Sequence, residues 1–319
     1  MKPKVYVTRH LPEPAWEKLV DACDVDIWDN DTPPAYDLIR EKVEDKVGLL
    51  CLLTDRIDAQ LMDSGKHLKV ISQCAVGYDN IDLKAAVERN IRVGNTPGVL
   101  TDATADMAFA LLLSAARRIG EGYDYVRAGK WETWGLSLLL GQEVWNATLG
   151  LIGFGRIGQA VARRARGFNM RVLYYDTSRN EKAEDEMGVE YRLLSELFEE
   201  SDYVSMHVNL TPETRGMIGK SALQMMKPTA ILINTSRGPV VDSEALYEAL
   251  KAGEIAYAAL DVTDPEPLPP DHKLLSLPNL LVVPHIASAT VKTRTQMAMM
   301  AVMNLIAGVN DKKLPYPVV

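Results

Sequence analysis

The fold of this chain is decided by a stretch that reads Leu149-Gly150-Leu151-Ile152-Gly153-Phe154-Gly155-Arg156-Ile157-Gly158. A helical pattern follows the last glycine, and a second apolar run then ends at Asp176. In such a unit Gly153 permits a tight turn, Gly155 lets backbone approach a pyrophosphate, and Gly158 lets the helix pack closely on the strand. The helix N-terminus presents N–H groups to phosphates, and Asp176 is placed to accept the hydroxyls of an adenosine ribose. The stretch therefore predicts a dinucleotide-binding site rather than a glycine-rich surface turn.

Composition is typical of a globular protein of about two domains. The 319 residues are 47% hydrophobic and 24% charged, which is enough to bury a large core. The formal net charge is −8 and the basic residues are scattered, which argues against nucleic-acid and anionic-membrane surfaces. The cysteines, Cys23, Cys51 and Cys74, lie far apart, so we expect neither a disulfide framework nor a metal site.

No targeting or membrane segment is recognisable in the sequence. The N-terminus turns straight into a strand pattern without an apolar signal region. The longest apolar helix, Met107–Ala116, is shorter than the roughly 20 residues that a bilayer span requires. We therefore expect a cytoplasmic protein with no membrane partner.

The first hundred residues alternate short apolar runs with amphipathic ones, as βαβ units in a parallel sheet do. The expected strands are Lys4–Val7, Val25–Trp28, Val47–Leu52, Leu68–Cys74 and Ile91–Gly94, and the expected helices are Pro14–Ala22, Ala35–Val43, Asp58–Asp63 and Asp82–Arg89. Asn95-Thr96-Pro97-Gly98 then breaks the pattern, and a long helix begins near Leu100. We place the crossover between two domains here.

The second domain is expected to hold six strands, the number typical of two mononucleotide-binding halves. They are Leu149–Ile152, Arg171–Tyr175, Tyr203–Val208, Ala230–Asn234, Ala256–Leu260 and Leu280–Val283. A final helical stretch, Lys292–Gly308, is long enough to return to the first domain. We therefore expect an α/β protein with two doubly wound parallel sheets. A Rossmann-type NAD-binding domain would cover residues 99–287, and a smaller, discontinuous, flavodoxin-like substrate-binding domain would cover residues 1–98 and 288–319.

A turn at Gln73–Asn80 follows a buried strand and precedes a helix. Ligands bind at this carboxyl edge of a parallel sheet, and Gly77 allows backbone to approach a small anion. The alternative is a plain strand-to-helix turn in which Asp79 or Asn80 caps the helix.

Trp131, Trp134 and Trp145 share an irregular stretch with Leu136–Leu140. So many exposed apolar side chains would be costly, so we expect a second subunit to bury them in a homodimer. Packing within the chain is the alternative.

Three residues near strand ends suit redox chemistry: Arg237, Glu266 between two prolines, and His285 after another. Oxidation of an alcohol by hydride transfer requires a group that removes the hydroxyl proton, and a histidine titrates near neutrality. A carboxylate on the other imidazole nitrogen fixes its tautomer, and an arginine can hold a substrate carboxylate with two hydrogen bonds. Each residue taken alone could also have no catalytic role, as an exposed cation, a solvated turn residue or a hydrogen-bonded histidine. The presence of all three residues near a dinucleotide site favours a catalytic role.

With these residues the chain resembles the D-isomer-specific 2-hydroxyacid dehydrogenases over essentially its whole length. The resemblance implies that His285 is the acid/base, Glu266 its partner and Arg237 the substrate clamp. It also implies that the backbone N–H groups of Val76 and Gly77 bind the substrate carboxylate. The motifs that carry it are Val76-Gly77-Tyr78-Asp79-Asn80, Thr101–Asp106, Gly153–Gly158, Ile233-Asn234-Thr235-Ser236-Arg237-Gly238, Ala259–Val262, Glu266-Pro267 and Pro284-His285-Ile286-Ala287-Ser288.

The same resemblance, with the strand ends, predicts the cofactor-binding residues. Asp261 is implied to face the nicotinamide carboxamide. Asp176 favours NAD, because its charge would repel the 2′-phosphate of NADP, while Arg179 makes NADP the second choice. The predicted set is Thr104, Gly153, Phe154, Gly155, Arg156, Ile157, Gly158, Asp176, His207, Asn209, Thr235, Ser236, Asp261 and Ala287.

Within the family the chain looks most like the glyoxylate and hydroxypyruvate reductases. Phosphite-oxidising relatives carry lysine where this chain has Val76, and the formate branch has glutamine where it has Glu266, so we expect neither activity. Asn209 stands where many relatives have proline, and Leu138 where some hydroxypyruvate reductases have tryptophan. Because of these two departures from the family pattern, the sequence does not settle the contacts to the adenine or the preferred size of the substrate.

We therefore expect an NAD(P)-dependent oxidoreductase that interconverts glyoxylate or hydroxypyruvate with its D-2-hydroxy acid. One alternative is a D-lactate- or phosphoglycerate-type dehydrogenase of the same family. Another is an NAD-sensing corepressor-like binding protein, since the same Arg, Glu and His occur in such proteins. Corepressors carry extra tails, and this chain has little outside its two expected domains, which favours the enzyme.

Overall fold

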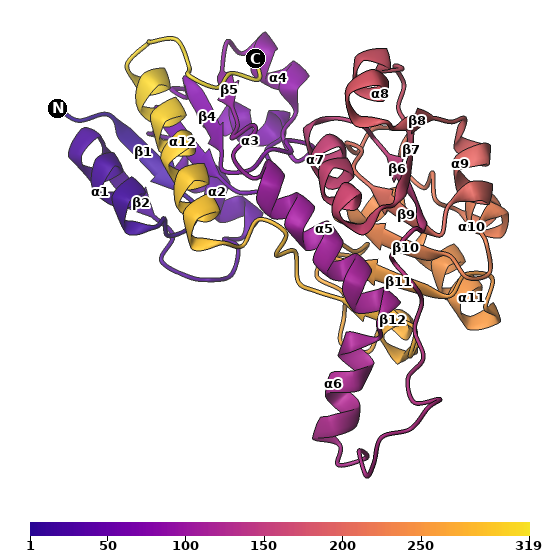
Figure 1. Cartoon of the computed structure of the whole chain (residues 1–319). Coiled ribbons are helices and arrows are strands. Elements are labelled where there is room, and N and C mark those ends of the chain that lie inside the picture. The colour runs from indigo at the N-terminus through magenta and orange to yellow at the C-terminus, as the bar shows by residue number, and fades with distance from the viewer. The chain divides into compact units, whose positions relative to one another are not determined.

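The computed structural model describes residues 1–319 and divides them into two compact units (Figure 1). Unit 1 comprises Met1–Leu100 and Ala289–Val319, and unit 2 comprises Thr101–Ser288. Both are parallel-sheet α/β units, as the sequence pattern predicts. None of the helices combines the length and the hydrophobicity that a membrane span requires.

Unit 1 is built on five parallel strands in the order β2-β1-β3-β4-β5, the flavodoxin-like arrangement. The strands are β1 (Lys4–Val7), β2 (Asp24–Ile27), β3 (Gly48–Cys51), β4 (Val70–Gln73) and β5 (Arg92–Gly94). The helices are α1 (Glu13–Ala22), α2 (Tyr36–Lys42), α3 (Ala59–Ser64), α4 (Leu83–Glu88) and α12 (Val291–Val309). Strands β3 and β4 are buried along their whole length, so both faces of the sheet are covered.

Short polar side chains start two helices of unit 1. Asp58 accepts the N–H of Leu61 at the start of α3, and Asp82 accepts the N–H of Ala85 at the start of α4. The N-cap of α4 is therefore Asp82, and the alternative that Asp79 or Asn80 caps this helix is wrong.

Helix α12 carries the chain back into unit 1, where Figure 1 draws it in yellow along the strands. Its buried side chains, including Ala301 and Leu305, join the apolar core formed with Val5 and Val70. Contact is close, because a Cβ added at Gly308 would lie 2.4 Å from the Cβ of Val70. The C-terminal helix is thus an integral part of the first unit.

Unit 2 is built on seven parallel strands in the order β12-β11-β10-β9-β6-β7-β8. The strands are β6 (Thr148–Ile152), β7 (Arg171–Tyr175), β8 (Glu190–Tyr191), β9 (Tyr203–Met206), β10 (Ile231–Asn234), β11 (Tyr257–Leu260) and β12 (Leu280–Val282). The α-helices are α5 (Thr101–Ala116), α6 (Ile119–Arg127), α7 (Arg156–Ala165), α8 (Glu181–Met187), α9 (Leu194–Glu200), α10 (Lys220–Met225) and α11 (Ser243–Ala252). Three short 3₁₀ turns, η1 to η3, cover Arg166–Phe168, Gly238–Val240 and Lys273–Ser276.

The expected count of six strands in the second domain is wrong by one. Strand β8 is an edge strand of two residues that pairs with β7. Two residues are too few to show the alternation that identifies a strand in a sequence.

Strand order in unit 2 reverses between β6 and β9, which pair with each other in parallel. Two apolar cores cover the two faces of this sheet, one including α5 and α7 and the other including α9, α10 and α11. In doubly wound sheets the point of reversal is where ligands bind, at the carboxyl ends of the strands. The turn after β6 lies at this point.

Helix α6 and the irregular segment after it extend away from the sheet of unit 2 (Figure 1). Trp131, Trp134 and Leu136 are 62%, 77% and 82% exposed, and α6 buries none of its own residues. The alternative that the tryptophan stretch packs within the chain is therefore wrong. We call residues 119–145 the arm.

Candidate active site

The glycine turn between β6 and α7 has the geometry that a dinucleotide needs. Gly153 has φ +93°, and a Cβ there would lie 2.6 Å from the backbone of His207, so only glycine fits. At Gly155, in contrast, a Cβ would meet nothing within 4 Å, so this side of the turn is open. The first N–H groups of α7, beginning at Arg156, have no partner inside the helix and can bind phosphate oxygens. The turn thus fits a pyrophosphate.

Asp176 ties the end of β7 to this turn. Its Oδ2 accepts the N–H of Phe154 at 2.7 Å, and its Oδ1 accepts the N–H of Thr177 at 2.7 Å. Oδ1 also accepts the hydroxyl of Thr177 at 3.2 Å. A carboxylate has about four acceptor positions, so Asp176 can still accept a hydroxyl group of a ribose. Nearby, Arg179 forms a forked ion pair with Glu184, with N···O distances of 2.9 and 2.7 Å.

The ends of β9 and β10 add uncharged groups to the same edge of the sheet. His207 accepts or donates a 2.9 Å hydrogen bond with Ser205, and burial lowers the pKa of His207 to about 3, so this imidazole is neutral. The hydroxyl of Thr235 is buried and has no hydrogen-bond partner inside the protein. An unpaired buried hydroxyl is costly unless a ligand completes it, so Thr235 also fits a bound cofactor.

The other predicted cofactor positions differ in how they are placed. Thr104 is buried in the first turn of α5, whereas Asn209 is exposed after β9 and its carbonyl accepts the hydroxyl of Thr214. Ile157 is partly buried in α7, and Ser236 is buried in the turn after β10.

Asp261 anchors the segment that carries the candidate catalytic histidine. One carboxylate oxygen accepts the N–H of Ile286 at 2.7 Å and the other accepts the N–H of Ala287 at 2.9 Å. Burial raises the pKa of Asp261, and these two hydrogen bonds oppose that rise. The backbone N–H of His285 also donates to the carbonyl of Asp261. His285 has φ +52°, a conformation that few non-glycine residues adopt, and these contacts hold it there.

His285 and Glu266 form a hydrogen-bonded pair. Nδ1 of His285 lies 2.6 Å from Oε1 of Glu266, and Oε2 of Glu266 accepts the N–H of Thr263 at 3.3 Å. Partial burial raises the pKa of Glu266, but the hydrogen bond and charge of His285, with the charge of Arg237, lower it by more, so the net shift is downward. The carboxylate is therefore ionised at neutral pH. Its hydrogen bond to Nδ1 orients the imidazole.

Arg237 is positioned by a buried asparagine that the sequence reasoning did not single out. The side chain of Asn234 donates to the carbonyl of Arg237 at 2.9 Å and accepts the N–H and hydroxyl of Ser236. These hydrogen bonds from the Asn234 side chain form an Asx-type turn, which fixes the backbone conformation between β10 and Arg237. The sequence feature that could have identified Asn234 is an amide residue at the end of an apolar strand. Arg237, Glu266 and His285 thus follow the ends of β10, β11 and β12.

Val76 and Gly77 belong to unit 1, in the turn after β4. The side chains of Asn95 and Gln73 donate to the carbonyls of Val76 and Gly77 at 2.7 and 3.2 Å. Neither Asn95 nor Gln73 had a predicted role.

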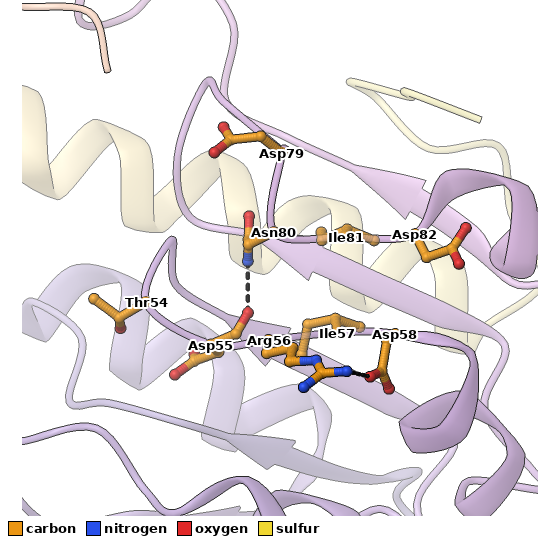
Figure 2. A pocket seen from close by; sticks show the side chains of 9 residues that line it. All are labelled: Thr54, Asp55, Arg56, Ile57, Asp58, Asp79, Asn80, Ile81 and Asp82. Carbon is orange, nitrogen blue, oxygen red and sulfur yellow. Dashed lines mark hydrogen bonds and ion pairs between the residues drawn. The ribbon is translucent and has the colours of Figure 1, made fainter. Parts of the chain in front are cut away.

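A pocket of about 380 Å³ lies beside this turn, and Figure 2 shows its lining. Four of the lining residues are aspartates, and the only cationic one, Arg56, is ion-paired with Asp58 at 2.7 Å. Such a lining repels anions, so this pocket does not suit a carboxylate substrate. It is lined by Thr54, Asp55, Arg56, Ile57, Asp58, Asp79, Asn80, Ile81 and Asp82.

Comparison with known proteins agrees with this geometry. A protein of Korarchaeum cryptofilum described as a glyoxylate reductase is 55% identical over 308 residues, covering 96% of this chain and 93% of the relative. A solved structure from Thermus thermophilus is 48% identical, with a TM-score of 0.94 over 99% of this chain and all of the other. An NADPH-dependent glyoxylate/hydroxypyruvate reductase from Sinorhizobium meliloti, solved with NADP and malonate, is 32% identical, with a TM-score of 0.90 over all of this chain and 97% of the other.

The family itself follows from a match over most of unit 2. Residues 109–287 match the family model described as D-isomer specific 2-hydroxyacid dehydrogenase, NAD binding domain. This range contains the glycine turn, Asp176 and the ends of β10, β11 and β12. The chain therefore belongs to the D-isomer specific 2-hydroxyacid dehydrogenases, a family of NAD(P)-dependent oxidoreductases.

Proposed function

We propose that this protein reduces a short 2-keto acid, glyoxylate or hydroxypyruvate, to the corresponding D-2-hydroxy acid with NADH. The observation that carries the proposal is the His285–Glu266 pair. Both residues lie in loops that follow strands of unit 2, at the same edge of the sheet as the dinucleotide turn. The names of the relatives from Korarchaeum cryptofilum and Sinorhizobium meliloti support the choice of substrate.

Each residue has one part in the proposed chemistry. Bound NADH supplies the hydride that reaches the keto carbon. His285, protonated and oriented through Nδ1 by Glu266, gives the proton on Nε2 to the carbonyl oxygen. Arg237 polarises that carbonyl, and the N–H groups of Val76 and Gly77 bind the substrate carboxylate. In this proposal residues 1–98 and 288–319 form the substrate-binding domain and residues 99–287 the NAD-binding domain.

We propose NAD rather than NADP as the preferred cofactor. A 2′-phosphate would meet the negative charge of Asp176 at the end of β7. Arg179, the residue that favours NADP, is engaged by Glu184. The charge available to a 2′-phosphate is therefore mainly repulsive.

We also propose that the arm forms the contact of a homodimer. Its side chains Ile119, Tyr123, Val126, Trp131, Trp134, Leu136, Leu140 and Trp145 are all more than half exposed. A patch of this composition on one continuous segment is typical of a subunit contact.

An enzyme of this kind would work in the cytoplasm.

The substrate is tested by following NADH absorbance with glyoxylate, hydroxypyruvate, pyruvate and phenylpyruvate, and with phosphite plus NAD in the oxidative direction. We expect the highest kcat/KM for glyoxylate or hydroxypyruvate and no oxidation of phosphite. The His285→Ala variant should lose about 10²–10⁴-fold in kcat, because it lacks the proton donor. Unchanged kcat in this variant would refute the role of His285, and inactivity of the intact protein on all four acids would refute the proposed function.

The Glu266→Gln variant tests the partner of the histidine. We expect kcat/KM to fall by about 10²-fold, because a neutral amide no longer stabilises the imidazolium. Glu244→Gln, an exposed change on α11, serves as the control and should leave kcat/KM unchanged. An unchanged kcat/KM in Glu266→Gln would show that Glu266 does not act through His285.

Cofactor choice is tested with the Asp176→Ala variant. The wild-type protein should show at least about tenfold higher kcat/KM for NADH than for NADPH, from the repulsion of one charge near the 2′-phosphate. Asp176→Ala should narrow this ratio, whereas Asp185→Ala, an exposed acid on α8, should leave it unchanged. A wild-type preference for NADPH would contradict the proposal.

Light scattering after size-exclusion chromatography tests the homodimer. We expect a dimer at micromolar concentration, and a monomer after Trp134→Ser combined with Leu136→Ser, because these changes remove exposed apolar contact area. Val87→Ser, a change at a residue 58% exposed outside the arm, should leave the dimer intact. A monomeric wild-type protein would overturn the proposal.

A further inference from the structure

The turn after β4 presents two N–H groups, those of Val76 and Gly77, that form no hydrogen bond inside the protein. The carbonyl of Ala75 shares a peptide plane with the first and accepts the N–H of Thr96 at 3.0 Å. The carbonyl of Val76 shares a plane with the second and accepts Nδ2 of Asn95 at 2.7 Å. A trans peptide directs its C=O and N–H in opposite directions. Because Asn95 and Thr96 bind the two carbonyls, the N–H groups of Val76 and Gly77 point away from Asn95 and Thr96.

The backbone of Asn95 is held by a different set of contacts. Asn304, on α12 and fully buried, donates to the carbonyl of Asn95 at 2.9 Å and accepts the N–H of Tyr316 at 2.9 Å. The N–H of Asn95 donates to the carbonyl of Tyr316 at 3.2 Å. A Cβ at Gly94 would lie 2.6 Å from the amide of Asn304, so these segments are in tight contact.

The division between backbone and side chain at Asn95 is informative. The backbone N–H and C=O join β5 to α12 and to the C-terminal segment, which is a structural task. The side-chain donor goes only to the carbonyl of Val76. Because Asn95 is 7% exposed, a charged side chain here would be costly, whereas a neutral amide can donate without a net charge. A substitution of the side chain leaves the backbone contacts in place.

A second pair of amides holds the far end of the turn. Gln73, fully buried at the end of β4, donates to the carbonyl of Gly77 at 3.2 Å and to Oδ1 of Asn80 at 2.8 Å. Asn80 in turn donates to the carbonyls of Leu52 and Asp55, and Figure 2 draws the second of these bonds. The turn is thus fixed on both sides before any ligand arrives, which lowers the cost of ordering it on binding.

We propose that Asn95 is a positioning residue for carboxylate recognition, because its side-chain amide aims the N–H of Gly77 at the substrate. The inference rests on the proposed function, in which the N–H groups of Val76 and Gly77 bind the carboxylate of a 2-keto acid. Two successive unpaired N–H groups form a concave site that suits an anion. The aspartate-lined pocket beside the turn does not suit an anion.

The experiment compares Asn95→Ala and Asn95→Asp with the wild-type protein. Asn95→Asp keeps the shape of the side chain but sets a carboxylate oxygen against the carbonyl of Val76. Asn310→Ala removes an exposed asparagine amide of similar geometry, which donates to Ile306 after α12, and serves as the control. Four quantities are measured: KM and kcat for glyoxylate, the Kd of NADH, the Kd of oxamate for the protein–NADH complex by fluorescence, and Tm.

Both Asn95 variants should raise KM for glyoxylate and the Kd of oxamate together, by about tenfold, the effect of one lost hydrogen bond with its acceptor left unpaired. The Kd of NADH should stay within about twofold, and Asn310→Ala should match the wild-type protein. A lower Tm with unchanged KM and oxamate affinity would overturn the proposal and leave Asn95 a purely structural residue. A fall in kcat alone would overturn it as well.

Oxamate binding separates this inference from the proposed function. If the wild-type protein reduces none of the 2-keto acids but binds oxamate, the proposed function fails. Weaker oxamate binding by the Asn95 variants would then still support the inference, and equal binding would overturn it. If the wild-type protein binds NADH but no oxamate, the inference is wrong, because no carboxylate site exists for Asn95 to position.

Discussion

The parallel alignment of the seven strands of unit 2 is the constraint on which the candidate site depends. Parallel strands all end at the same edge of a sheet, so every loop that follows them meets at that edge. The glycine turn follows β6, Asp176 follows β7, and Arg237 and His285 follow β10 and β12. Residues separated by more than a hundred positions in the chain thus contribute to one region without any special contact to bring them there.

These loops contain many polar backbone groups, and side chains satisfy them. Asp176, Asp261 and Glu266 each accept at least one backbone N–H, although each is also a candidate for binding or catalysis. A buried peptide group left without a partner is costly, so the loops are stable only with such acceptors. A carboxylate that holds a loop is also held by it. The residues that would contact a ligand are therefore fixed before the ligand binds, which is the condition for precise chemistry.

Neutral amides do the corresponding work for carbonyl groups. Asn234 wraps the chain that leads to Arg237, and Asn95 and Gln73 hold the carbonyls of Val76 and Gly77. Amides suit this task because they donate in buried positions without carrying a charge into them. Unit 1 and unit 2 thus use the same device, an amide at or just after the end of a strand, to orient backbone beside a candidate ligand site.

The sequence by itself determined the two parallel α/β units and the glycine turn, and it predicted that Arg237, Glu266 and His285 follow strands of unit 2. These features depend on local patterns: apolar runs of strand length, glycines at fixed spacing, and polar residues directly after strands. Strand β8 was missed because two residues carry no such pattern. Only the tertiary structure showed that Asp82, and not Asp79 or Asn80, caps α4. It also showed that Trp131 and Trp134 are exposed. It alone revealed the hydrogen bonds of Asn95 and Asn304, since a contact between residues 209 positions apart produces no pattern in the local sequence.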